Sequence, residues 1–221
     1  MVNIIALTDI HGNVKNLNNI LKSESFSTCD LILIAGDLTN FGDEKEISSV
    51  ISLLEETKKP YYYVPGNCDY VNKFNENQLR RNLHSNYVLF LGYAIIGIGG
   101  SLKTPFNTPF EITEEDVERI IKEVYKRISK ESYKGLLIVS HNPPYNTKLD
   151  LTKSGIHVGS KILRKYIEEV KPILVISGHV HEARSVDQIN ETIIVNPGPL
   201  KDGFFAEIKL EEKPTVVLKS I

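Results

Sequence analysis

The chain of 221 residues is 41% hydrophobic and 24% charged, values close to those of ordinary globular proteins. Its 26 Lys and Arg against 28 Asp and Glu give a formal net charge of −2. This balance argues against a general nucleic-acid or membrane-surface binder, because both need a large basic field. No run approaches the roughly 18 apolar residues of a membrane span, so we expect no membrane partner.

The two cysteines, Cys29 and Cys68, are too few for a disulfide framework and fit reduced intracellular thiols. The apolar start Val2–Leu7 has neither the basic leader nor the cleavage site of a secretory signal. We therefore predict a cytoplasmic protein with one domain over residues 1–221, and leave a homo-oligomer open.

Short apolar runs alternate with amphipathic segments along the first two thirds of the chain. The runs expected to form buried strands are Val2–Leu7, Leu31–Ala35, Tyr61–Val64, Leu136–Ser140 and Ile173–Ser177. Helical spacing of apolar residues follows a capping-box pattern at Asp43 and an N-cap pattern at Thr113, and recurs over 162–170. Further strands are expected at Ala183–Asp187, Thr192–Val195, Phe204–Leu210 and Thr215–Leu218. The pattern predicts an α/β fold with a second set of strands in its C-terminal third.

Asp, Asn and His residues follow the ends of five predicted strands. The segments are Asp9-Ile10-His11, Gly36-Asp37, Gly66-Asn67-Cys68-Asp69, Ser140-His141-Asn142 and Gly178-His179-Val180-His181. Because the carboxyl ends of parallel strands share one edge of a sheet, we expect these segments to converge. The glycines remove Cβ bulk where backbone must pass close to a charged centre. Burying so many unpaired polar groups would cost about 1–3 kcal/mol each, which disfavours a purely structural explanation.

The donor types in these segments point to divalent metals. Imidazole, carboxylate and amide groups suit Mn, Fe, Zn, Ni or Co without choosing among them. Two ions about 3.5–4 Å apart lower the pKa of a shared water and stabilise charge developing on phosphorus. A single structural zinc fits poorly, because such sites are closed, tetrahedral and usually built from cysteine.

The five blocks resemble the pattern D-x-H, G-D, G-N-x-[DE], a strand-end His and G-H-x-H of the calcineurin-like metallophosphoesterases. The resemblance implies a four-layer αββα sandwich, with two mixed sheets flanked by helices, and a metal-bridging hydroxide that attacks phosphorus. It implies one metal on Asp9, His11, Asp37 and His181. A second metal would share Asp37 and bind Asn67, His141 and His179. The catalytic residues would be Asp37, Asn67, Asp69, His141 and His179, with Asp69 in a supporting role.

Cys68 departs from many members of this family, which carry His at that position to protonate the leaving alcohol. A thiol is a poorer proton donor there than an imidazolium. We therefore expect phosphodiesters to be favoured over alkyl monoesters. The alternative is that Cys68 is a small buried filler.

The chain also resembles the predicted phosphoesterases related to the cyclic-nucleotide phosphodiesterase Icc, although through motifs that say less about mechanism. The segments that carry this resemblance are 97–110, 141–145, 155–160 and 196–199. His157 precedes an expected helix start at Ser160, and is either a phosphate contact or a solvated loop histidine. The expected substrate-binding residues are Asn67, Cys68 and His157.

Three other functions compete with a phosphodiesterase that acts on a small phosphoester. A phosphomonoesterase or nucleotidase of the same fold would use the same ligands. A nuclease would need a basic track beside the site, which the sequence lacks. A non-catalytic interaction scaffold of this fold can lose metal ligands, whereas this chain keeps all seven.

Overall fold

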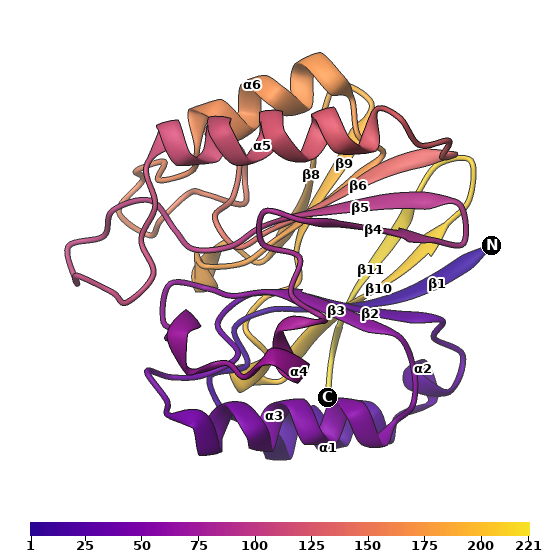
Figure 1. Cartoon of the computed structure of the whole chain (residues 1–221), viewed down its shortest axis with the longest axis vertical. Coiled ribbons are helices and arrows are strands. Elements are labelled where there is room, and N and C mark those ends of the chain that lie inside the picture. The colour runs from indigo at the N-terminus through magenta and orange to yellow at the C-terminus, as the bar shows by residue number, and fades with distance from the viewer.

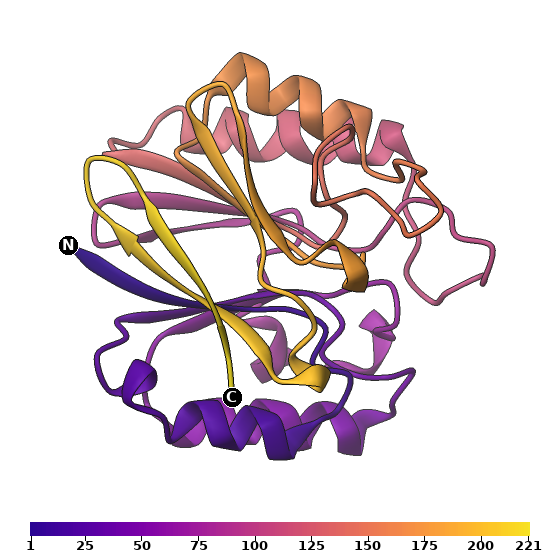
Figure 2. The same ribbon diagram turned by 180° about the vertical axis from the view of Figure 1, so that it is seen from behind.

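The computed structural model describes residues 1–221 and contains two mixed β-sheets packed face to face (Figure 1). The first sheet has the order β11 (Thr215–Ser220), β10 (Phe204–Leu210), β1 (Val2–Leu7), β2 (Leu31–Ala35) and β3 (Tyr61–Val64). The second has the order β4 (Tyr87–Phe90), β5 (Tyr93–Ile98), β6 (Gly135–Ser140), β7 (Leu174–Ser177), β9 (Thr192–Asn196) and β8 (Ser185–Ile189). Figure 2 shows that the late strands divide between the sheets, with β8 and β9 in one and β10 and β11 in the other.

Helices cover the outer face of each sheet (Figure 1). Those beside the first sheet are α1 (Val14–Leu21), α2 (Glu24–Ser27), α3 (Glu44–Glu56) and α4 (Glu76–Leu79). Those on the second are α5 (Glu114–Ile128) and α6 (Lys161–Val170). Three single 3₁₀ turns, η1 (Val71–Lys73), η2 (His181–Ala183) and η3 (Leu200–Asp202), lie in connections. The predicted αββα sandwich is confirmed. None of the helices has the length and apolar character that crossing a bilayer requires.

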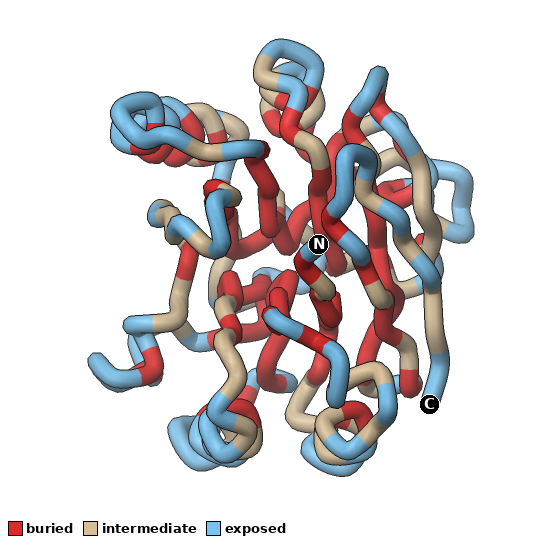
Figure 3. The backbone as a smooth tube through the Cα atoms, turned by 90° about the vertical axis from the view of Figure 1, so that its right-hand side faces the viewer, coloured by how far each residue is buried: buried red, intermediate tan, exposed pale blue.

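Side-chain alternation along the strands builds three apolar layers. In β1, Ile5 and Leu7 pack toward α1 and α3, whereas Ile4 and Ala6 pack against the second sheet. A third layer lies between the second sheet and the helices α5 and α6. Buried backbone is accordingly concentrated in the two sheets, and the outer sides of the helices are exposed (Figure 3). Strands buried on both faces explain the continuous apolar runs in the sequence.

Local sequence signals set most of the helix starts. The Asp43 carboxylate accepts hydrogen bonds from the first turn of α3, but Glu46 bonds the Asn40 amide, so the expected reciprocal box is not formed. Thr113 does form a capping box with Asp116 at the start of α5. The hairpin β4–β5 was not expected from the sequence.

The parallel strands position the polar segments. β1, β2 and β3 run parallel in the first sheet, and β5, β6, β7 and β9 do so in the second. The His141 ring at the end of β6 lies 2.7 Å (Nδ1 to O) from the Ala35 carbonyl at the end of β2. The carboxyl ends of the two parallel sets therefore meet, and the segments that follow them share one edge of the sandwich.

His84 has a structural place that gives the fold a pH dependence. Its Nδ1 accepts the Gly99 amide proton at 2.9 Å, and its ring packs edge-on to Phe110. Burial, reinforced by the charge of Arg119, lowers its pKa to about 4. Between about pH 4 and 6.5, His84 is protonated in the unfolded chain but mostly neutral in the folded chain. The free energy of unfolding therefore falls as the pH drops through this window.

We predict that His84→Asn, which keeps an acceptor for Gly99 but does not titrate there, weakens this dependence. Between pH 7 and pH 5 the wild-type protein should lose about 1–2 kcal/mol more unfolding free energy than the variant. Urea titrations at both pH values measure the difference. Equal pH slopes in the two proteins would rule out the assigned role of His84.

Candidate metal centre

The seven predicted ligand residues come together at this edge of the sandwich. Six of them are linked by contacts below 4 Å between their polar atoms, and the His179 ring lies against the His141 ring with centroids 5.2 Å apart. Three overlapping groups of these side chains, one of which includes Cys68, place their donor atoms within 4.8 Å of one another. Most of these residues are buried.

One half of the cluster is built by Asp9, His11 and His181. The Nε2 atom of His181 lies 3.2 Å from both Asp9 Oδ1 and His11 Nε2. The second oxygen of Asp9 is held from behind, because it accepts hydrogen bonds from Thr8 Oγ1 (2.8 Å) and the His179 amide (3.2 Å). Oδ1 is therefore fixed toward the two imidazoles.

Asp37 lies between the two halves. Its Oδ2 is 3.7 Å from His11 Nε2, and its Oδ1 is 3.5 Å from His141 Nε2. His141 Nε2 is also 2.9 Å from Asn67 Oδ1. The Cys68 amide donates to Asp37 Oδ1 at 2.8 Å and so fixes this carboxylate from the third segment. One carboxylate thus faces both groups of donors.

The backbone of the cluster is strained. Asp9, His11, Asp37 and His179 all have positive φ, between 46° and 69°, a region that non-glycine residues seldom adopt. Such strain costs about 1–3 kcal/mol per residue and persists where the surroundings impose it, typically at functional sites. Four strained residues in one cluster indicate that the surrounding structure holds these side chains in place for a function.

The glycines before three of these segments have no room for a side chain. A Cβ atom on Gly66 would lie 2.0 Å from Asp37 Oδ1, and one on Gly178 would lie 1.8 Å from Thr8 Oγ1. On Gly36 it would lie 2.3 Å from His141 Nδ1. The expected close approach of backbone to a charged group is present at Gly66, beside the Asp37 carboxylate, and at Gly178, beside the Asp9 carboxylate, whereas the close neighbour of Gly36 is the His141 ring.

Asp69 supports the cluster from outside it. Its two oxygens accept hydrogen bonds from the amides of Leu38, Thr39 and Gly66 and from the Thr39 hydroxyl, at 2.8–3.1 Å. Burial and the charge of Asp37 raise its pKa to about 6. These contacts tie the loop that carries Asp37 to the turn that carries Asn67, which makes Asp69 a positioning residue.

Electrostatics keep the imidazoles available as donors of lone pairs. Burial lowers the pKa of His11, and burial together with His141 lowers that of His179 to about 4. Burial works against ionisation of Asp9, but its bond to His181 and the neighbouring histidines hold its pKa well below the usual range. His181, although partly desolvated, has a raised pKa because of Asp9. Near pH 7 the cluster therefore offers an ionised carboxylate at Asp9 and neutral rings at His11 and His179.

The donor atoms of the cluster are arranged to bind divalent cations rather than to form hydrogen bonds with one another. His141 Nδ1 faces a carbonyl and so carries the proton, which turns the lone pair of Nε2 in the neutral ring toward the oxygens of Asn67 and Asp37. Bonds of about 2.0–2.2 Å would place two ligands of one ion about 3–3.5 Å apart. The observed separations run from 2.9 to 3.9 Å and are centred near this spacing.

Cys68 is buried against Asp37 at the edge of the cluster. Burial and the negative charge of Asp37 raise the pKa of its thiol. The Asn67 amide donates toward its Sγ at 3.6 Å. The thiol is therefore a neutral group beside the cluster.

His157 lies outside the cluster. Its Nδ1 is 2.7 Å from the buried Asp150 carboxylate, and its ring packs edge-on to Tyr145. Its neighbours Ile156 and Val158, but not His157, line the pocket that opens beside Asn67 and His179. The structure therefore gives this ring a carboxylate partner, and a substrate contact from it stays a prediction.

Two residues near the cluster were not anticipated. Thr8 orients Asp9, as described above. Lys201 donates its amide to the Asp9 carbonyl at 3.1 Å, and its positive charge adds to burial in opposing protonation of His11 and His181. The sequence feature that could have pointed to Lys201 is the segment 196–199, which is rich in Gly and Pro and precedes it.

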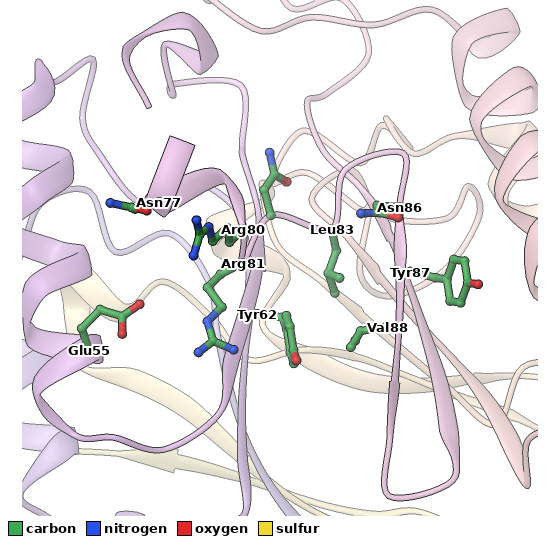
Figure 4. Close-up of a pocket in the computed structure, with 10 residues that line it drawn as sticks. Glu55, Tyr62, Asn77, Arg80, Arg81, Leu83, Asn86, Tyr87 and Val88 are labelled. Carbon is green, nitrogen blue, oxygen red and sulfur yellow. The ribbon is translucent and has the colours of Figure 1, made fainter. Parts of the chain in front are cut away.

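A separate pocket of about 580 Å³ lies between the edge strands β3 and β4 (Figure 4). Its lining includes Arg80, Arg81, Tyr62 and Tyr87 (Figure 4). None of the converging polar residues lines this pocket. The candidate site is therefore the cluster at the strand ends.

Comparison with known proteins identifies the family of this chain. The family model for calcineurin-like phosphoesterases matches residues 2–183. An uncharacterized protein of Methanocaldococcus jannaschii is 36% identical over 89% of this chain and 88% of its own length. The probable glycerophosphodiester phosphodiesterase of Arcobacter nitrofigilis is 24% identical over 96% of this chain and 77% of its own length.

A solved structure shows the same fold. The crystal structure of a Thermus thermophilus protein superposes with a TM-score of 0.80 at 20% identity, over 99% of this chain and 98% of that one. The match of the family model covers all five polar segments and both sheets' parallel strands up to η2. The chain therefore belongs to the calcineurin-like phosphoesterase family, whose members are metal-dependent hydrolases.

Proposed function

We propose that this chain is a phosphodiesterase that uses two divalent ions to hydrolyse a small phosphoester. The observation that carries the proposal is Asp37, whose two carboxylate oxygens face two separate groups of donors. Asp9, His11 and His181 would complete one ion's ligands, and Asn67, His141 and His179 the other's. The donor set suits Mn, Fe, Zn, Ni or Co. We also propose that residues 1–221 form one domain, because both sheets contribute to one buried layer.

The protein's own residues would hold the phosphate between the cluster and the adjoining pocket. Bound divalent ions supply positive charge for the phosphate oxygens and make a water molecule more acidic. Asn67 and His179 belong both to the cluster and to the pocket wall, so they are placed to orient the ester. Asp69 keeps the Asp37 loop in register, and the Ala35 carbonyl fixes the tautomer of His141.

The preference for diesters is supported by Cys68. At this position the cluster offers a buried neutral thiol, which is a weak acid for protonating an alkoxide. Leaving groups that need little protonation, such as the aryloxide of an aryl phosphodiester, avoid this weakness. The name of the Arcobacter nitrofigilis relative, a probable glycerophosphodiester phosphodiesterase, is consistent with the same choice.

We predict that Cys68→His shifts the preference toward monoesters. The variant places a proton donor beside Asp37, so the ratio of kcat/KM for an alkyl monoester to that for an aryl diester should rise about tenfold or more. Rates on both substrates with manganese measure this ratio, and Cys68→Ser is the matched control without an imidazole. A wild-type protein that already prefers the monoester would contradict the diester proposal while leaving the metal centre in place.

A further inference from the structure

A pocket of about 590 Å³ opens directly beside the metal cluster. Asn67 and His179 form its inner end. Much of the remaining wall is apolar and comes from two loops, one between β5 and α5 and the other between β6 and α6, together with Val180. Figure 1 and Figure 2 show both loops at the same end of the molecule. The apolar lining residues are Leu102, Pro105, Phe106, Ile156, Val158 and Val180.

Both loops are attached to the segments that carry the cluster. The Leu102 amide donates to Asn142 Oδ1 at 3.2 Å, next to His141. The Lys153 amide donates to Glu182 Oε1 at 3.2 Å, next to His181. The pocket wall is therefore fixed relative to the cluster by the same strand ends that position the ligands.

The loop that carries Phe106 is wound around one carboxylate. Glu111 Oε1 accepts from the amide and hydroxyl of Thr104 and from the amide and hydroxyl of Thr108, at 2.7–3.2 Å. Burial opposes ionisation of Glu111, but these bonds lower its pKa to about 2, so it stays charged at neutral pH. The Thr104 hydroxyl in turn accepts from the Phe106 amide at 3.2 Å. This internal bonding holds the tip of the loop in one shape.

The apolar side chains at the two loop tips are open to water. Phe106 is 80% exposed and Ile156 is 60% exposed, although both line the pocket. The charged side chains in the wall are Lys103 and Glu182, whose charges are opposite and do not form a basic track for a polyanion. A ligand with a compact apolar group would cover both side chains and gain from removing their surface from water.

We propose that Phe106 and Ile156 form an apolar clamp that binds one of the two organic groups of a phosphodiester, so that the preferred substrates carry an aryl or alkyl group there. This inference rests on the proposed phosphodiesterase function, because a diester brings two organic groups to the cluster and the clamp binds one of them. Phe106 and Ile156 are then specificity-determining residues that contact the organic group of the substrate. The residues of the cluster contact the reacting atoms.

Binding of two diesters to the manganese-loaded protein tests the clamp without requiring turnover. Calorimetry should show diphenyl phosphate binding at least about tenfold more tightly than dimethyl phosphate. Phe106→Ala and Ile156→Ala should each remove several-fold of this difference, and Phe106→Leu should restore part of it. Leu91→Ala, an exposed apolar side chain in the β4–β5 turn, is the matched control and should change neither constant.

Turnover of bis(p-nitrophenyl) phosphate by the same proteins separates the clamp from the function. In the Phe106→Ala variant KM should rise about fivefold or more while kcat stays within about twofold of the wild-type value. Equal affinities for the two diesters, or a kcat that falls with KM unchanged, would overturn the clamp. A clear preference for diphenyl phosphate that Phe106→Ala abolishes, but without turnover of the nitrophenyl diester, would support the clamp and reject the proposed activity.

Discussion

Replacing Asp37 with asparagine is expected to lower kcat/KM for phosphoester hydrolysis by about a thousandfold, the equivalent of roughly 4 kcal/mol of transition-state stabilisation. The amide keeps the size of the carboxylate but removes the negative charge that faces both groups of donors, His11 on one side and His141 on the other. It also turns an N–H group toward one of these imidazoles. Metal content, measured by mass spectrometry of the dialysed protein, should fall together with the rate.

The matched control is Asp43→Asn, the same chemical change outside the cluster. Asp43 caps α3 and asparagine caps a helix about as well, so rate, metal content and melting temperature should stay close to wild type. Circular dichroism of both variants shows whether the fold is kept. An Asp37→Asn protein with full metal content and wild-type rate would show that the ligand assignment is wrong.

Gly66→Ala is expected to lower kcat/KM about a hundredfold or more, although it replaces none of the proposed ligand residues. The added Cβ would lie 2.0 Å from Asp37 Oδ1 and 2.3 Å from the Asp37 amide nitrogen, so the carboxylate and its backbone must move. A displacement of about 1 Å in a reacting arrangement costs on the order of a hundredfold in rate. Steady-state rates on an aryl phosphodiester, with metal content determined in parallel, give the result.

Gly135→Ala provides the comparison for Gly66→Ala. At Gly135, at the start of β6, the nearest atom to an added Cβ is Ile173 Cδ1 at 2.9 Å, the far end of a side chain that can rotate away. This variant should keep its activity within about twofold. If Gly66→Ala were as active as Gly135→Ala, the close approach of the two turns would not matter for the chemistry.

The convergence of the site could be predicted because two independent signals agreed. Apolar runs of strand length fixed β1, β2, β3 and β7 nearly to the residue, and parallel strands bring their carboxyl ends to one edge. The hairpin β4–β5 escaped prediction because residues 87–98 form one apolar stretch interrupted by Gly92. Periodicity does not separate two short strands from a buried helix in such a stretch.

Other features depend on contacts between residues far apart in the chain. Asp69 could be given a supporting role from its motif, but its partners Leu38 and Thr39 are visible only once β2 and β3 lie side by side. The sequence leaves His157 between a phosphate contact and a solvated loop histidine, and the Asp150 carboxylate beside it becomes visible only in the folded loop. Phe106 is exposed at the tip of a loop whose shape depends on hydrogen bonds from Thr104 and Thr108 to Glu111. No local sequence pattern predicts these bonds.

We propose that the converging residues form a metal-dependent phosphoesterase site. The most direct test is the rate on an aryl phosphodiester and on its monoester, with the protein loaded with manganese and again after chelation, alongside the metal-to-protein ratio. We predict hydrolysis that requires metal, two ions per chain and a preference for the diester. A protein that binds no metal and hydrolyses neither ester in either state would contradict this claim and favour an interaction scaffold built on the same fold.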